Sequence, residues 1–174
     1  IGLPGESVES FAKGFNRLVE LGPQEIQVGV LKRLRGTPII RHTAEWEMRY
    51  SPLPPYEILS NKLIDFPTLQ RLKRFSKYWD LISNSGNFLQ TAPLIWQVAS
   101  PFDSFLQFSD WLHQQSGQRF GFSLKSLTTY LHQYLTSVGF IEEELVLTSL
   151  AKDYQRLGRV DAPKFLQPWL RKGA

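Results

Sequence analysis

Apolar residues recur along most of this chain at the three-to-four-residue spacing of an α-helix. The pattern predicts helices over 55–62, 68–83, 91–99, 101–116, 123–138 and 142–157. Several of them carry a boundary signal, such as Pro101 in a first turn and Gly139 after the fifth helix. The apolar stripes are wide enough to be buried against one another. We therefore expect a mostly α fold, in which a bundle of about five or six helices follows a shorter β/α segment.

The first 50 residues carry a different pattern, a helix followed by a strand. Ser7 is a good N-cap for this helix, and Gly22 ends it. Alternating apolar residues then predict a strand over 25–34, followed by a short helix near 39–48. The strand has no obvious partner close in sequence. We expect it to pair with residues near Ile39, or with a second copy of the chain in a homodimer.

A Gly/Pro-rich stretch, residues 1–6, precedes the helix and suits a tight turn from a strand into a helix. A turn of that kind without its strand leaves an unpaired sheet edge and an uncovered apolar helix face. We therefore expect the chain to be the C-terminal part of a longer enzyme. Residues 51–56 contain three prolines and predict a stiff linker. This linker would separate a β/α segment, 1–50, from a helical domain, 57–174.

The composition excludes several classes of protein. The 174 residues include no cysteine, which rules out disulfides, thiolate zinc sites and cysteine-ligated iron–sulfur clusters within this chain. The net charge of +4 is mild, and the densest basic stretch, 71–77, has the pattern of the solvated side of an amphipathic helix. We therefore do not expect nucleic acid as a partner. No apolar run approaches the roughly 18 residues of a membrane span. With no secretion signal at the start, we expect a cytoplasmic protein that makes no membrane contact.

Few residues offer catalytic or metal-binding chemistry. The three histidines, His42, His113 and His132, lack the spacing of a metal site, so we expect no metal ligands. The acidic run 142–144 falls at a helix start, where negative charge complements the helix dipole. Asp153 is expected to pair with a basic side chain of its own helix. The five tryptophans and twelve phenylalanines are interpreted as core residues.

One motif is more specific. The sequence Gly2-Leu3-Pro4-Gly5-Glu6, directly before a helix, resembles the Gly-Leu/Phe-Pro-Gly-Glu signature of the radical S-adenosylmethionine enzymes. The resemblance continues through Ser7, Phe11, the predicted strand at 26–31 and Gly36-Thr37-Pro38. The segments 54–57, 69–73 and 84–88 are similar to a helical domain that trails one group of cobalamin-binding members. Relatives in this group are sometimes labelled as resembling the Mg-protoporphyrin IX monomethyl ester oxidative cyclase.

This resemblance implies that residues 1–50 form the C-terminal edge of a β/α barrel, followed by a domain of unknown function. In the family, a Cys-x-x-x-Cys-x-x-Cys loop near the start of the barrel holds a [4Fe–4S] cluster, and S-adenosylmethionine bound to it is cleaved to a 5′-deoxyadenosyl radical. A late Gly-rich turn contacts the adenosine side of that cofactor. By resemblance, the cofactor-binding residues here are Gly2, Pro4, Gly5, Glu6 and Leu31.

The resemblance also implies what this chain lacks. The whole enzyme is expected to use S-adenosylmethionine, a [4Fe–4S] cluster and cobalamin, and no cofactor is expected in this chain by itself. Its partners would be the upstream barrel and cobalamin domain, with a tetrapyrrole or another small molecule as the substrate. We expect the chain alone to be non-catalytic, because it has no cysteines. The alternatives are an independent helical binding or interaction module, or an RNA-binding domain.

Overall fold

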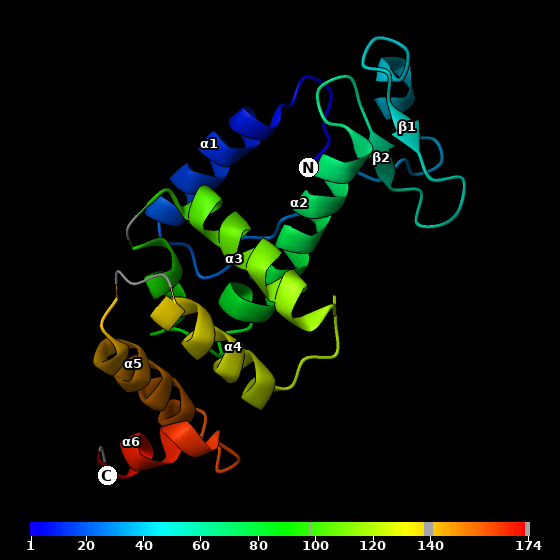
Figure 1. The fold of residues 1–174 in the computed structure, drawn as a ribbon. Coiled ribbons are helices and arrows are strands. Elements are labelled where there is room, and N and C mark those ends of the chain that lie inside the picture. Colours follow the sequence, from blue (N-terminus) through cyan, green and yellow to red (C-terminus); the bar gives the residue numbers. More distant parts are fainter. Residues whose placement is uncertain (98, 138–140, 173–174) are drawn as a thin grey trace. The chain divides into compact units, whose positions relative to one another are not determined.

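The computed structural model describes residues 1–97, 99–137 and 141–172, and this part of the chain is mostly α-helical (Figure 1). Its helices are α1 (Val8–Glu20), α2 (Phe66–Trp79), α3 (Pro101–Ser116), α4 (Leu124–Ser137), α5 (Glu143–Arg156) and α6 (Gln167–Lys172). A small antiparallel sheet pairs β1 (Arg49–Tyr50) with β2 (Ile58–Ser60). The expected mostly α fold is confirmed. No helix in the described ranges is long and apolar enough to cross a membrane.

The chain packs as two units, Ile1–Ser76 and Lys77–Ala174. Helix α2 contains the residues at which the two units divide. The buried residues Leu69 and Phe75 belong to the first unit, and the buried Trp79 belongs to the second. The proline-rich residues 51–56 lie within the first unit. The functional division predicted at this segment stays a prediction.

In the first unit, residues 25–34 do not form the strand that their alternation predicts. A single antiparallel bridge joins Lys32 to Glu57. It is made by the Arg33 N–H, which donates to Tyr56 O at 3.0 Å, and the Ile58 N–H, which donates to Leu31 O at 2.9 Å. The antiparallel partners of this segment therefore lie beyond the prolines, and the alternative of pairing near Ile39 is wrong. Pairing with a second copy of the chain stays a prediction.

Helix α1 begins with a capping box. The Ser7 Oγ accepts from the Ser10 N–H at 3.2 Å, and the Ser10 Oγ accepts from the Ser7 N–H at 2.9 Å, which satisfies N–H groups that have no partner within the helix. The helix buries Phe15, whose ring centroid lies 5.0 Å from that of Phe75 in α2. Leu18, in the next turn of α1, is exposed.

Five of the predicted helices are confirmed, as α1, α2, α3, α4 and α5. The predicted helix at 55–62 is wrong. The segment contains β2 instead, because its backbone hydrogen-bonds to Leu31 and to β1. The helices expected near 39–48 and 91–99 are shorter than predicted, single 3-10 turns at Pro38–His42 and Ala92–Trp96. Some predicted helix boundaries fall on residues that the structure does not describe. These residues are Val98, Val138 and Gly139.

Aromatic rings fill the core of the second unit. The Trp79 ring centroid lies 5.3 Å from Trp96 and 4.9 Å from Phe105. Phe108, in the next turn of α3, meets Tyr134 of α4 at 5.0 Å between centroids. Phe105 and Phe108 are fully buried, and such edge-to-face pairs add to the stabilisation from apolar burial. The interpretation of the aromatic residues as core residues holds for this cluster.

Candidate functional site

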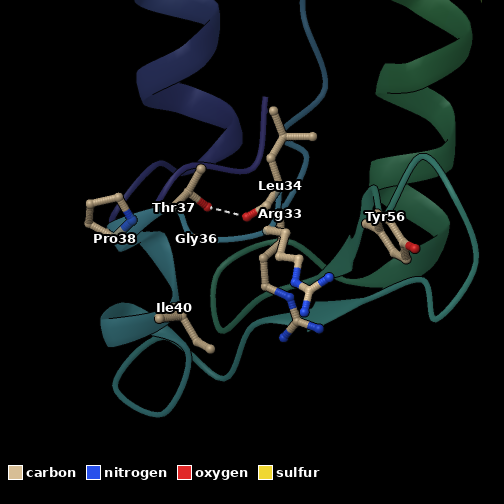
Figure 2. Close-up of a pocket in the computed structure, with 8 residues that line it drawn as sticks. Arg33, Leu34, Gly36, Thr37, Pro38, Ile40 and Tyr56 are labelled. Carbon is tan, nitrogen blue, oxygen red and sulfur yellow. Dashed lines mark hydrogen bonds between the residues drawn. The ribbon is translucent and has the colours of Figure 1, made fainter.

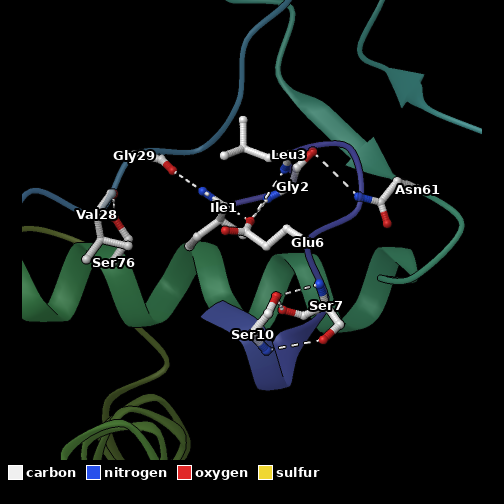
Figure 3. A network of polar contacts seen from close by, with 10 residues as sticks. All are labelled: Ile1, Gly2, Leu3, Glu6, Ser7, Ser10, Val28, Gly29, Asn61 and Ser76. Atoms are coloured by element: carbon white, nitrogen blue, oxygen red, sulfur yellow. Dashed lines mark hydrogen bonds and ion pairs between the residues drawn. The ribbon is translucent and has the colours of Figure 1, made fainter. Parts of the chain in front are cut away.

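The turn Gly2–Glu6, which we call the glycine turn, is closed by its own glutamate (Figure 3). The Glu6 Oε2 accepts from the Gly2 N–H at 2.8 Å and from the Leu3 N–H at 3.4 Å. The Glu6 N–H in turn donates to Leu3 O at 3.1 Å. The carboxylate is therefore engaged inside the turn, which makes Glu6 a residue that positions the turn's backbone.

The structure explains separately why each of the two positions in the turn is a glycine. Gly2 has a φ of +88°, and a Cβ there would lie 2.7 Å from Cγ2 of Ile58, too close for any real contact. Gly5 has a φ of +77°, and its Cβ would lie 3.4 Å from the Trp46 ring. Both φ values favour glycine, and at Gly2 the close approach of Ile58 also requires it. The half-buried Pro4 lies between them.

The backbone on either side of α1 hydrogen-bonds in the manner of parallel strands. The backbone nitrogen of Ile1 donates to Gly29 O at 2.6 Å, and Ile1 O accepts from the Leu31 N–H at 2.9 Å. One residue thus bonds to two residues that flank its neighbour, which is the parallel pattern. A helix that connects two parallel strands makes a β–α–β crossover. Here the parallel pattern extends over Ile1 alone, and neither of the two segments is a strand of the structure. The glycine turn follows directly after Ile1.

The same packing brings Leu31 close to the glycine turn. Leu31 bonds to Ile1 through its N–H and to Ile58 through its carbonyl oxygen, and Ile58 is the side chain against which Gly2 packs. The Asn61 Nδ2 also donates to Gly2 O at 3.5 Å. Gly2 and Leu31, two of the residues predicted from the resemblance, are thus connected through Ile1 and Ile58. A cofactor role for the predicted residues stays a prediction.

A cavity of about 750 Å³ opens where the chain leaves the segment 29–33 (Figure 2). We call it the arginine cavity, and besides the bend at residues 36–37 its lining residues are Arg33, Leu34, Arg35, Pro38, Ile40 and Tyr56. Sequence reasoning missed it. The sequence predicts a stiff linker at the proline-rich segment, whereas in the structure Tyr56, at its end, hydrogen-bonds through its backbone to Arg33. The available signal was two arginines two positions apart, one at the end of the predicted strand 25–34 and one directly after it.

The histidines do not come together. His132 lies 3.1 Å from a carboxylate oxygen of Glu143 and stacks on Phe165, while His42 lies 4.0 Å from Glu45. Within the described ranges, no group of three or more His, Asp or Glu side chains could hold a metal ion. Glu143 itself lies in the first turn of α5, as the helix-dipole interpretation of the acidic run predicts.

Asp153 holds two segments of the second unit together. Its buried carboxylate accepts from the Gln90 N–H at 3.0 Å, and from the Thr91 N–H and Oγ1–H at 3.0 and 2.8 Å. Arg156, one turn along α5, lies 4.0 Å away, as expected for a same-helix pair. Burial raises the pKa of Asp153, against the opposing effect of these hydrogen bonds and of Arg156. This position is a structural one.

Comparison with known proteins gives one match. Residues 44–173 match a family described as "Protein of unknown function (DUF4080)", which covers well over half of the 174-residue chain. No curated protein and no solved structure matches the chain. The glycine turn precedes the matched region, whereas Tyr56, β1 and β2 fall within it.

Proposed function

The chain belongs to the DUF4080 family, and we propose that it is the non-catalytic C-terminal part of a radical S-adenosylmethionine enzyme. The observation that carries the proposal is the parallel hydrogen-bond pattern of Ile1 with Gly29 and Leu31 across α1. A β/α barrel repeats this unit, and its active site lies at the carboxyl ends of the strands. In the proposed barrel the glycine turn would lie at that edge, and it carries the motif that resembles the family signature.

In this proposal the glycine turn forms one wall of the cofactor site. Gly2 and Gly5 have left-handed backbone and carry no side chain. Ile58 packs against Gly2, and a ligand would approach the backbone at Gly5. Glu6 holds the turn closed through the Gly2 and Leu3 N–H groups. Leu31, held next to the turn by its bonds to Ile1 and Ile58, supplies apolar contact to an adenine ring.

The chain's residues do not fit the iron–sulfur cluster, because the sequence has no cysteine to ligate it. The cluster, when bound elsewhere in the enzyme, would supply the electron that cleaves S-adenosylmethionine. We propose that the cluster loop and a cobalamin domain belong to the upstream part of the same enzyme. An apolar groove of about 400 Å³ between α1 and residues 26–29 would receive the neighbouring barrel element.

The first test is the coding sequence upstream of Ile1. A Cys-x-x-x-Cys-x-x-Cys motif within a barrel-length stretch is expected there, and its absence would end the proposal. If the motif is present, the complete protein can be reconstituted with iron, sulfide and S-adenosylmethionine, and its 5′-deoxyadenosine measured. We expect Glu6→Gln to lower 5′-deoxyadenosine formation about tenfold, because an amide loses the charge-assisted bonds that close the turn.

The matched control is Glu20→Gln at the exposed end of α1, which removes the same charge and leaves the turn intact. Equal activity of Glu6→Gln and wild type would show that the glycine turn has no part in cofactor binding. Loss of activity in both variants would indicate a general effect of charge.

A second function is favoured by the separate packing of Lys77–Ala174. A helical unit with its own aromatic core could act as an interaction module beside the barrel. Cooperative unfolding of the helical part expressed alone would support this alternative, and a molten product would argue that this part depends on the first unit.

A further inference from the structure

We propose that the arginine cavity binds a small organic molecule that carries a carboxylate or phosphate group on an apolar body. The cavity's volume, about 750 Å³, lies within the range of small-molecule sites, roughly 300–1,000 Å³. The inference rests on the residues around Arg33 and Tyr56 and does not require the chain to be part of a radical S-adenosylmethionine enzyme.

The charge of the cavity is uncompensated. Arg33 and Arg35 both line it, and no acidic residue is among its lining residues. In the described part of the chain, neither arginine has a carboxylate within 4.0 Å. Two guanidinium groups around one cavity repel each other, and a bound anion would remove that repulsion. Guanidinium matches the planar oxygens of carboxylate and phosphate groups better than an ammonium does.

The side chain of Arg33 is held in place by an aromatic ring and not by a carboxylate. Its guanidinium carbon lies 4.9 Å from the centroid of the Tyr50 ring in β1, a cation–π contact that orients the side chain and leaves N–H groups free to donate. Its backbone N–H bonds to Tyr56 O at 3.0 Å. This bond joins the backbone of Arg33 to that of Tyr56, and both residues line the cavity (Figure 2).

Tyr56 has a backbone conformation that its side chain disfavours. Its φ of +58° is left-handed, which is a genuine outlier for a bulky residue. Residues held in such conformations cluster at ligand sites, because the surrounding structure maintains them at a cost in stability. The Tyr56 N–H bonds to Leu53 O at 2.9 Å, so the turn that contains Pro54 and Pro55 sets this conformation.

The remaining walls are apolar and preformed. Leu34 and Ile40 are 57% and 63% exposed, so their apolar surface is accessible to a ligand. The bend between them is fixed by Thr37, whose Oγ1–H and N–H both donate to Leu34 O, at 2.7 and 3.2 Å. These walls would cover the apolar body of a ligand while the arginines bind its anionic group.

The test is isothermal titration calorimetry of the full 174-residue chain with three probes that share a naphthalene ring and differ in the group attached to it. These are 1-naphthoate, 1-naphthyl phosphate and the neutral 1-naphthalenemethanol. We expect binding of at least one anion and no detectable binding of the alcohol. A preference between the two anions identifies the carboxylate or the phosphate as the natural group.

The variant Arg33→Gln/Arg35→Gln should weaken anion binding at least tenfold. The control Lys13→Gln/Arg17→Gln on the exposed side of α1 removes the same net charge and should bind as wild type does. Tyr56→Gly removes the ring and relieves the left-handed backbone, so it should fold at least as well as wild type and still bind several-fold more weakly.

Three results would overturn the inference. The first is that neither anion binds at concentrations of about 10 mM, which is the weak end of small-ligand affinities. The second is that the neutral alcohol binds as tightly as the anions, and the third is that the α1 control weakens binding as much as the arginine variant does. Circular dichroism and thermal melting of each variant separate loss of the site from loss of the fold.

Discussion

A side chain at position 2 would collide with Ile58, and the backbone there is left-handed as well. We expect Gly2→Ala to lower the free energy of unfolding by about 1–3 kcal/mol, because strain at φ +88° adds to the contact at 2.7 Å. Urea unfolding followed by tryptophan fluorescence measures the change.

Gly14 offers the matched control for this prediction. It lies within α1, and a Cβ there meets nothing within 4 Å. We expect Gly14→Ala to stabilise the chain by roughly 0.5–1 kcal/mol, because alanine loses less backbone entropy in a helix. Equal effects of the two substitutions would contradict the role given to Ile58.

At the scale of single elements, Asp153 joins α5 to the start of the 3-10 turn Ala92–Trp96. We expect Asp153→Asn to lower the free energy of unfolding by about 1–3 kcal/mol. The Asn amide keeps one acceptor oxygen and places an NH₂ group against a second set of donors, at Gln90 or Thr91. The exposed Asp161→Asn, which breaks a surface pair with Arg159, should leave stability unchanged.

The pH dependence of this difference has a definite sign. Burial raises the pKa of Asp153 in the folded chain, so the folded state takes up this proton at a higher pH than the unfolded state does. Its contribution to stability is complete below the ordinary pKa, near 4, and declines as the pH rises through the raised value. The effect of Asp153→Asn should therefore shrink from pH 4 to pH 7. An effect that grows over this range would contradict the burial-dominated pKa.

The helices could be predicted from the sequence because their signals are local. The boundaries of α3 follow from Ser100, Pro101 and Gly117, with Ser100 Oγ accepting from the Asp103 N–H and Gly117 in a left-handed C-cap. The segments 25–34 and 55–62 could not be predicted, because they bond to each other across the proline-rich stretch, as Arg33 does to Tyr56 and Ile58 to Leu31. Alternation and prolines indicate extended chain without stating what it pairs with.

The candidate sites divide in the same way. The glycine turn could be predicted because it consists of five consecutive residues, and the bonds from Gly2 and Leu3 to Glu6 lie within it. The arginine cavity needs Tyr56 to return to Arg33 across a loop that includes β1. A pair of arginines in a sequence is ordinarily a solvated surface, so the cavity emerges only from the fold.

At the scale of the whole molecule, each unit depends on its own buried aromatic residues. We expect Phe105→Ala to lower the free energy of unfolding by roughly 3–5 kcal/mol, because it leaves a void between Trp79 and Phe108. Near-ultraviolet circular dichroism during urea unfolding reports on this cluster directly. Phe120, which is 82% exposed, provides the control, and Phe120→Ala should unfold at the wild-type urea concentration.

Helix α2 belongs to both units, and this has a practical consequence for anyone transplanting the helical part into another protein. A cut at the unit boundary would sever the helix in its last turn, and a cut directly after the prolines would retain β2 without β1. The natural place to begin is Asp65, whose Oδ1 accepts from the Thr68 N–H at 2.9 Å and starts the helix. The transplanted piece would then expose Leu69 and Phe75, and polar replacements at these two positions should decide whether it remains monomeric.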